Sequence, residues 1–286
     1  MDTFIKSFLD YLQKEKQYST NTLSSYEGDL DQLYSYMKSK YPNSDKELVE
    51  KLVKPEVISG YLKSISEKKY AISTLARKIA SVKSFMKYMV EKGVLKEDSI
   101  PNLDSPQVNK SITKPLSISE VKLLIAEPAK STAIEGKRDR AMLELLYATG
   151  LTASELMALD VVDIDYENNS ILCGKKTKKR RVINTDTHIS KILKEYIDES
   201  RVKLMNNTNE IALFLNRRGE RLTRQGFWQI LQGYAERVGL GKRVTPRSLR
   251  SSFVIHRLKS GADLQKIQEL MGHAHISTTK AYQYLQ

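Results

Sequence analysis

The densest group of chemically active side chains in this sequence is the segment Lys175-Lys-Thr-Lys-Lys-Arg-Arg181, which holds six basic residues in seven. It lies between two short β-like runs, so we expect it at the tip of a hairpin. Lysine side chains there can act as point charges against the phosphates of a DNA backbone. A solvated tip without a partner is the alternative, and nuclear targeting needs the same composition. The run alone therefore indicates phosphate contact only weakly.

A second group of candidate residues lies near the C-terminus. The stretch TPRSLRSSFVIHRL (245–258) places Arg247 and Arg250 on one expected helix. His273 follows a glycine, and Tyr282 comes nine residues later. Taken singly, a tyrosine is more commonly a packing residue than a nucleophile, and a histidine is more commonly a cap or core residue. Only the spacing of these residues distinguishes them.

The net charge of +13 is concentrated in the later part of the chain. Residues 1–100 hold 17 Lys and Arg against 14 Asp and Glu, whereas the remaining 186 residues hold 30 against 20. This asymmetry favours a polyanionic partner, most simply nucleic acid. A basic surface that only keeps the protein soluble is the alternative.

Length and composition are typical of a globular protein with two domains. The 286 residues are 40% hydrophobic and 28% charged, and no apolar run approaches the length of a membrane span. The opening MDTFIKSFLDYL carries charges where a signal peptide would be apolar. The single cysteine, Cys173, excludes a disulfide framework and gives no metal cluster. We therefore expect a cytoplasmic protein without membrane contact.

The first hundred residues have the apolar periodicity of helices. Four stripes predict four helices, at 4–12, 23–37, 57–65 and 75–89. Ser19 or Thr20 is the expected cap of the second and Ser73 that of the fourth. We expect residues 1–98 to form a small all-α domain, followed by a proline-punctuated linker at 99–115.

Residues 116–286 mix helical and β-like patterns, and Ser117 with Glu120 has the spacing of a capping box. The expected helices span about 118–126, 137–148, 153–159, 187–204, 223–238, 246–259, 263–271 and 277–284. The expected strands are VVDIDY, SILCG and RRVINT. The predicted fold is therefore mainly α with a small β-sheet, with a mixed α+β domain after the all-α one.

The spacing of Arg250, His273 and Tyr282 resembles the C-terminal signature of the tyrosine recombinases, the family of phage integrases and Xer-type recombinases. YATGLTASEL resembles the segment of the family's first arginine, ILCGKKTKKRRVINT its catalytic hairpin, and LTRQGFWQILQGYAERVGL the stretch before its second arginine. The N-terminal helices and the linker match the family's core-binding domain in length and pattern. The resemblance covers nearly the whole chain, most strongly its last 175 residues or so.

The resemblance implies a DNA strand transferase that requires neither a metal nor another cofactor. Tyr282 aligns with the nucleophile, whose attack on a phosphodiester gives a 3′-phosphotyrosyl bond and a free 5′-hydroxyl. Arg250 aligns with the second clamp arginine, whose planar fork suits two phosphate oxygens. His273 aligns with a histidine that hydrogen-bonds the scissile phosphate, and Lys175 with the hairpin lysine that protonates the leaving oxygen.

Two positions depart from the family pattern. Arg247 stands where the family usually has a histidine or lysine, and arginine cannot act as a base near neutral pH, although it can add positive charge. Thr152 stands where the family's first arginine stabilises charge in the transition state. Losing one such donor typically costs about 10²–10³ in rate. We expect Thr152 to offer one hydroxyl and no charge.

Further basic residues are expected to contact the DNA backbone: Lys176, Lys178, Lys179, Arg180, Arg181, Lys242 and Arg243. Lys176 and Lys178 are also near substitutes for Lys175. Arg247, Arg243 or the hairpin lysines are the candidates for rebuilding the clamp around Thr152.

Two functions remain open at this point. One is a working recombinase that assembles on DNA as a homo-oligomer, dimer to tetramer, alone or with a related recombinase. The other is a non-catalytic relative that binds DNA in an architectural or regulatory role. The retained nucleophile and clamp residues favour the first, and the two departures favour the second. Only four residues follow Tyr282, where family members often carry a helix that docks on a neighbouring subunit.

Overall fold

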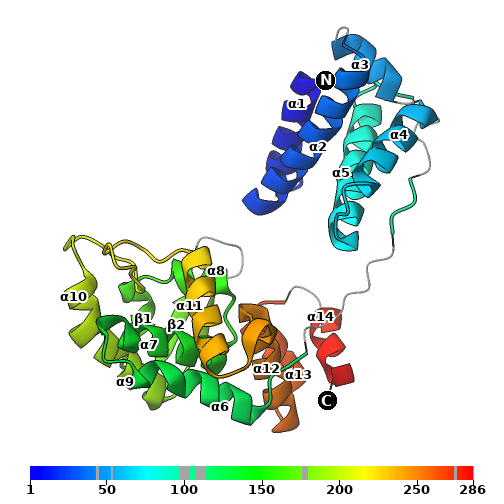
Figure 1. Cartoon of the computed structure of the whole chain (residues 1–286). Helices are drawn as coiled ribbons and strands as arrows, with labels where there is room; N and C mark the ends of the chain where they lie inside the picture. Colours follow the sequence, from blue (N-terminus) through cyan, green and yellow to red (C-terminus); the bar gives the residue numbers. More distant parts are fainter. Residues whose placement is uncertain are drawn as a thin grey trace. The chain divides into compact units, whose positions relative to one another are not determined.

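The computed structural model describes residues 1–42, 45–52, 54–96, 103–106, 114–175, 180–273 and 276–285. The chain forms two compact units, Met1–Lys110 and Ser111–Gln286 (Figure 1). Each unit has a hydrophobic core of its own. Most of the predicted linker, 99–115, lies outside the described residues, so its boundaries stay a prediction.

The described part of the N-terminal unit contains five helices, one more than the sequence predicted (Figure 1). They are α1 (Asp2–Lys14), α2 (Thr20–Lys40), α3 (Asp45–Leu52), α4 (Pro55–Ser66) and α5 (Ile72–Glu91). The helix that the sequence did not predict is α3, which buries Leu48, Val49 and Leu52 in the common core. With only eight residues, it is too short for a periodic pattern to stand out.

The two expected caps of this unit have different outcomes. Ser19 caps α2, because its hydroxyl accepts the backbone N–H of Thr22 at 3.2 Å. The expectation that Ser73 caps α5 is wrong. The helix already begins at Ile72, and Ser73 lies inside its first turn, while Ala71 occupies the cap position without a side-chain bond.

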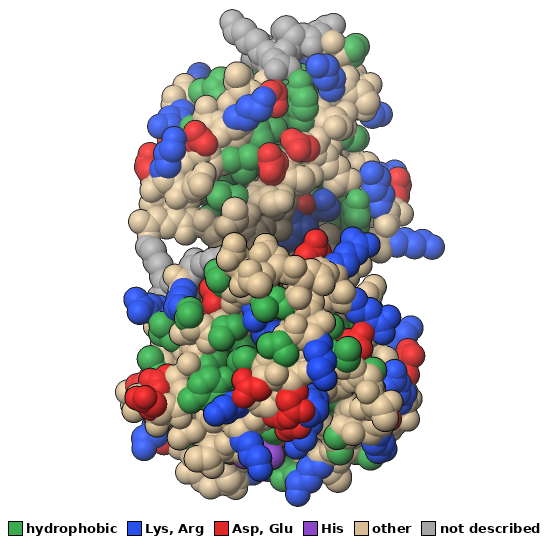
Figure 2. Space-filling model, turned by 90° about the vertical axis from the view of Figure 1, so that its left-hand side faces the viewer, with side chains coloured by type: hydrophobic (Ala, Val, Ile, Leu, Met, Phe, Trp, Pro, Cys, Tyr) green, Lys and Arg blue, Asp and Glu red, His purple; other side chains and the backbone are tan. Residues whose placement is uncertain are grey.

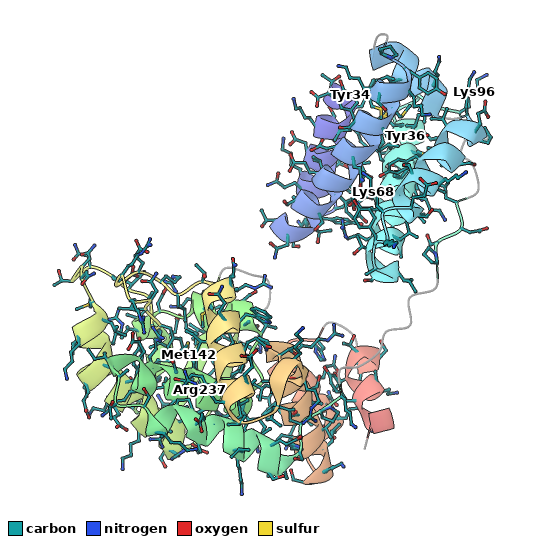
Figure 3. All side chains as sticks on the ribbon, in the orientation of Figure 1. Tyr34, Tyr36, Lys68, Lys96, Met142 and Arg237 are labelled. Atoms are coloured by element: carbon teal, nitrogen blue, oxygen red, sulfur yellow. The ribbon has the colours of Figure 1, made fainter. Side chains whose placement is uncertain are left out.

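Helices also make up most of the C-terminal unit. They are α6 (Ile118–Ala126), α7 (Ile134–Thr149), α8 (Ala153–Ala158), α9 (Thr187–Glu195), α10 (Val202–Leu204), α11 (Arg224–Arg237), α12 (Pro246–Lys259), α13 (Leu264–Met271) and α14 (Ile276–Lys280). A π-helical stretch, η4 (Tyr196–Arg201), joins α9 to α10, so the helix predicted over about 187–204 is continuous. At the centre lies α7, which packs against α9 and α12 and whose Met142 is fully buried (Figure 3).

The strands form one antiparallel sheet in the order β1 (Ile164–Asp165), β2 (Ser170–Cys173), β3 (Arg181–Asn184). Ile171 lies opposite Ile183, and both are buried in the core of the unit. Asn169 supplies the β1–β2 turn with φ +47°, a conformation that asparagine tolerates. The predicted fold class, mainly α with a small β-sheet, is confirmed.

Local capping fixes the ends of the helices around the site. The predicted box at α6 is present: Ser117 Oγ accepts the N–H of Glu120 at 3.2 Å, and the Glu120 carboxylate accepts the N–H of Ser117 at 2.8 Å. Asp263 caps the start of α13. Gly272 ends this helix with φ +65°, which a residue with a side chain rarely adopts, and it directs the chain into His273.

Candidate active site

A cavity of ≈ 750 Å³ gathers five of the six residues that the sequence singled out at catalytic positions, all except Lys175. The starts of α8, α11 and α12 and the C-terminal turn enclose it, through Thr152, Ala153, Ser154, Arg224, Gln225, Trp228, Thr245, Pro246, Arg247, Arg250, His273, Thr278 and Tyr282. The N-termini of α11 and α12 add partial positive charge to the arginines. The cavity is therefore suited to an anion.

Arg250 is the most enclosed arginine of the cavity wall, with 12% of its side chain exposed. Its Nη1 donates to the carbonyl of Gly150, and its Nη2 donates to the carbonyl of Met271 at 2.7 Å. Burial lowers the pKa of Arg250, while the charges of Glu155 and Tyr282 oppose this shift. Because an arginine keeps its proton in proteins, Arg250 places a fixed positive charge in the wall.

His273 and Tyr282 lie side by side next to Arg250. Their rings are nearly parallel, with an interplanar angle of 4° and centroids 6.5 Å apart. His273 Nε2 is 3.4 Å from Arg250 Nη2, and its Nδ1 is 2.9 Å from the Thr279 hydroxyl. Tyr282 belongs to η6 (Ala281–Leu285), which packs against α12. The structure thus brings together three residues that are far apart in the sequence.

Thr152 is the N-cap of α8 and forms a capping box with Glu155. Its hydroxyl accepts the N–H of Glu155 at 3.1 Å and donates to the Glu155 carboxylate at 2.8 Å. The same carboxylate accepts the N–H of Thr152 at 2.8 Å. The sequence predicted that the Thr152 hydroxyl is available to a phosphate. The structure differs, because the only hydrogen of this hydroxyl is already donated in the hydrogen bond to the Glu155 carboxylate. Thr152 therefore contributes neither charge nor a free donor to the cavity.

Glu155 lies between two arginines behind the cavity wall. One carboxylate oxygen pairs with Arg181 Nη1 at 2.5 Å, and the other is 3.9 Å from Arg250 Nη1. Burial alone would raise the pKa of Glu155, but hydrogen bonds from Arg181 and Thr152 outweigh it, and the pKa is lowered. The ionised carboxylate consequently holds Thr152, Arg181 and Arg250 in one charged network.

The expectation that Arg181 contacts DNA does not fit its position. Only 12% of its side chain is exposed, and its Nε donates to the carbonyl of Leu270 at 2.6 Å. Together with the Glu155 pair, this bond ties β3 to α8 and to the end of α13, just before His273. Arg181 therefore supports the cavity wall rather than a DNA-facing surface.

Lys175 does not line the main cavity. Its ammonium group pairs with Asp163, whose side chain is 3% exposed. Both residues border a separate cavity of ≈ 120 Å³. The structure therefore does not bring Lys175 together with Tyr282 and Arg250.

The other basic candidates differ in their surroundings. Arg247 is exposed in the first turn of α12 and lines the main cavity, and in the described parts of the chain no acidic group pairs with it. Arg243 pairs with Glu120 at 2.8 Å and does not line that cavity. Arg180 and Lys242 are exposed. Lys176, Lys178 and Lys179 lie outside the described residues.

Figure 2 shows lysine and arginine side chains spread over one face of the C-terminal unit with acidic side chains among them. In this view the positive charge does not form one continuous patch.

Sequence reasoning missed Glu155, Arg224 and Trp228. Glu155 follows Thr152 at the spacing of a capping box, which is a pattern that the sequence contains. Attention to the arginine expected at position 152 left this pattern unused. Arg224 and Trp228 lie one turn apart at the start of α11, and Trp228 is 48% exposed. A cation in the first turn opposes the helix dipole, so Arg224 carried a detectable sign of a role outside helix stability.

Neither a metal-ligand cluster nor a membrane-spanning helix is found in the described ranges. They contain no group of three or more His, Cys, Asp or Glu side chains that could hold a metal ion. Within the same ranges, no helix is both long and apolar enough to cross a bilayer.

Solved structures show the same fold. A crystal structure of XerA recombinase is similar with a TM-score of 0.54 and 26% identity, covering 100% of this chain and 94% of that one. The XerH site-specific recombinase bound to its difH substrate is similar with a TM-score of 0.72 and 21% identity, covering 91% of this chain and 76% of that one.

Sequence comparisons identify the family. The tyrosine recombinase XerC of Herpetosiphon aurantiacus is 42% identical over 285 residues, covering 100% of this chain and 91% of the relative. The tyrosine recombinase XerD of Listeria innocua is 37% identical, covering 100% and 95%. Residues 5–93 match the phage integrase N-terminal SAM-like domain, and residues 114–286 match the phage integrase family. The chain therefore belongs to the phage integrase family and to its tyrosine recombinases.

Proposed function

We propose that this protein is a site-specific DNA recombinase that breaks and rejoins duplex DNA through a tyrosine-linked intermediate. The Tyr282 hydroxyl oxygen attacks the scissile phosphorus and loses its proton, and the bond from phosphorus to the 5′-oxygen breaks. The 3′-phosphate stays on Tyr282, and the leaving 5′-oxygen takes up a proton. Attack by the 5′-hydroxyl of another strand reverses the step and releases Tyr282 with the strands exchanged.

The observation that carries the proposal is the convergence of Arg250, His273 and Tyr282 in one electropositive cavity. Arg250 presents a charged planar group whose remaining N–H groups suit phosphate oxygens. His273 lies within 3.4 Å of Arg250 and stacks on the ring of Tyr282. A phosphate held by these two groups is in the same cavity as Tyr282, so that binding brings the nucleophile and the scissile phosphate together.

Lys175 is the proposed donor of the proton to the 5′-oxygen. In the structure its ammonium group pairs with Asp163, at the edge of a different cavity. We therefore infer that Lys175 leaves Asp163 when DNA enters, and that this movement accompanies assembly of the reactive site.

The proposed partners are duplex DNA and further recombinase subunits, as a homo-oligomer of two to four copies or together with a related recombinase. The XerH neighbour was solved on its difH substrate, and a λ integrase neighbour was solved as a dimer on a core site. Those structures share the fold of this chain, and the net charge of the C-terminal unit supports binding to DNA.

Covalent trapping tests the proposed function. The substrates are a difH duplex and duplexes selected from a randomised library by binding to the protein. In a set of versions of each duplex, a nick is placed shortly downstream of one phosphate after another, so that cleavage releases a short fragment with a free 5′-hydroxyl, which diffuses away. We expect a DNA adduct that survives denaturing electrophoresis with the wild type and with the control Tyr284→Phe, and none with Tyr282→Phe. If binding-selected duplexes give no adduct with the wild type, the proposed function is wrong.

The second candidate, a non-catalytic DNA-binding relative, is not favoured. Similarity to tyrosine recombinases at about 40% identity extends over the full chain. Tyr282 and Arg250 also stand where the resemblance expects the nucleophile and the second clamp arginine.

A further inference from the structure

The α8 part of the cavity wall, formed by Thr152, Ala153 and Ser154, carries no positively charged side chain. The hydroxyl of Thr152 already donates its hydrogen bond to the Glu155 carboxylate, and this carboxylate is negatively charged. Negative charge that develops on the phosphate oxygens during attack by Tyr282 would therefore meet no cation on this side, unless another element supplies one.

Arg224 is the cation that borders this wall. It lines the cavity together with Thr152, Ala153 and Ser154, and it begins α11, the helix that packs against α8. Its side chain is exposed, and no ion pair or hydrogen bond is formed by it within the described residues. The guanidinium group is thus available to a ligand of the cavity.

Neighbouring contacts fix the position of Arg224 relative to α8. Three residues earlier, Arg221 Nη1 donates to the carbonyls of Met157 and Leu159, at 3.0 and 2.9 Å, and its Nη2 pairs with Asp160. These acceptors lie at the end of α8 and just after it. Thr223 then caps α11 by accepting the N–H of Gly226 at 3.0 Å. The start of α11 is therefore anchored to the helix that Thr152 begins.

The other candidates for this charge are placed less well. Arg243 is paired with Glu120, and Lys175 is paired with Asp163. Arg247 also lines the cavity, but it lies on α12 in the turn before Arg250, so it adds charge on the side that Arg250 already occupies.

We propose that Arg224 is a catalytic residue that supplies, from α11, the positive charge that Thr152 does not provide at the scissile phosphate. The inference rests on the proposed function. Arg224 forms and breaks no covalent bond, and it stabilises the negative charge on a non-bridging oxygen while the tyrosine–phosphorus bond forms. Removing one such donor typically lowers the rate by about 10²-fold or more.

The first experiment measures single-turnover adduct formation on the nicked duplex, with protein in saturating excess. We expect Arg224→Ala to slow adduct formation by about 10²-fold and Arg224→Lys by less, because lysine keeps the charge. Arg218→Ala is the matched control, an exposed arginine of the same unit that does not line the cavity. Circular dichroism and the dissociation constant for DNA verify that each variant folds and binds.

Two further arms separate a charge effect from a structural one. A duplex with a methylphosphonate at the scissile position lacks one charged oxygen, so the rate ratio of wild type to Arg224→Ala should shrink towards one. Thr152→Arg introduced into Arg224→Ala should raise the rate of adduct formation at least tenfold above that of Arg224→Ala alone, although it removes the α8 cap and lowers stability.

The outcomes distinguish this inference from the proposed function. If the wild type, Arg224→Ala and Arg218→Ala form the adduct at the same rate, the proposed role of Arg224 is wrong and the recombinase proposal stays intact. An equal loss on the charged and the methylphosphonate duplex would also overturn it. Absence of wild-type adduct would instead remove the proposed function on which it rests.

Discussion

At the scale of single residues, the candidate active site depends on which partners occupy its hydrogen-bonding groups. Thr152 and Arg181 both bind Glu155, whereas Arg250 binds the carbonyls of Gly150 and Met271. These bonds hold Arg250 in place before any ligand arrives. Such preorganisation is what makes a positive charge effective in a transition state, because no reorganisation is required at the moment of reaction.

Glu155 gives this network a measurable dependence on pH. Its pKa in the folded protein lies below the ordinary value of 4.5. The ionised carboxylate therefore contributes stability above about pH 4.5, and this contribution is lost as the pH falls through the folded pKa. We expect Glu155→Gln to lower the midpoint of urea unfolding at pH 6. Between pH 6 and pH 3.5, this midpoint should fall less in the variant than in the wild type.

Glu167→Gln, at an exposed position, is the control and should change neither the midpoint nor its pH dependence. Parallel pH profiles for the wild type and Glu155→Gln would contradict the assigned role of the network.

At the scale of elements, β2 ends in the turn that carries Lys175, and the short turn before β1 carries Asp163. The carboxylate of Asp163 has two uses, since it pairs with Lys175 and also accepts the N–H of Asp160 at 2.9 Å. Burial of a paired charge makes the pair costly to break, so the resting position of Lys175 is held by its environment.

Asp163→Asn should weaken this hold while keeping an oxygen for the N–H of Asp160. We expect single-turnover adduct formation to become several-fold faster, because Lys175 reaches the phosphate more readily. The measurement is the rate at saturating protein, with Asp165→Asn as the control on the same hairpin. A slower rate at unchanged DNA affinity would show that Asp163 holds Lys175 in its reacting position.

Local patterns in the sequence predicted most elements, and long-range contacts explain what they missed. The capping box of Ser117 and Glu120 and the cap at Ser19 depend on neighbours in sequence, so they were predictable. Placement of Arg224 beside Thr152 depends on Arg221 reaching the end of α8, which no local pattern encodes. The internal role of Arg181 was hidden for the same reason, because its partner Glu155 lies 26 residues earlier.

At the scale of the whole molecule, positive charge is unequally divided between the two parts of the chain, with most of the excess after residue 100. Binding to DNA releases counterions from each phosphate that a basic residue neutralises. Affinity for duplex DNA should therefore fall by about 10³-fold or more between 50 and 200 mM salt, if six or more phosphates are contacted.

Fluorescence anisotropy across this range of salt concentration gives the slope. Arg180→Ala removes an exposed charge beside the hairpin and should make the slope shallower by about one unit. An affinity that does not change with salt would contradict phosphate contact by the basic residues.

Mass spectrometry of the trapped and nuclease-trimmed complex shows which residue forms the covalent bond with DNA that we assign to Tyr282. We expect a peptide that contains Tyr282, with a nucleotide attached to its side chain through a 3′-phosphate. A nucleotide on another residue, or none in a complex that binds the nicked duplex, would contradict it.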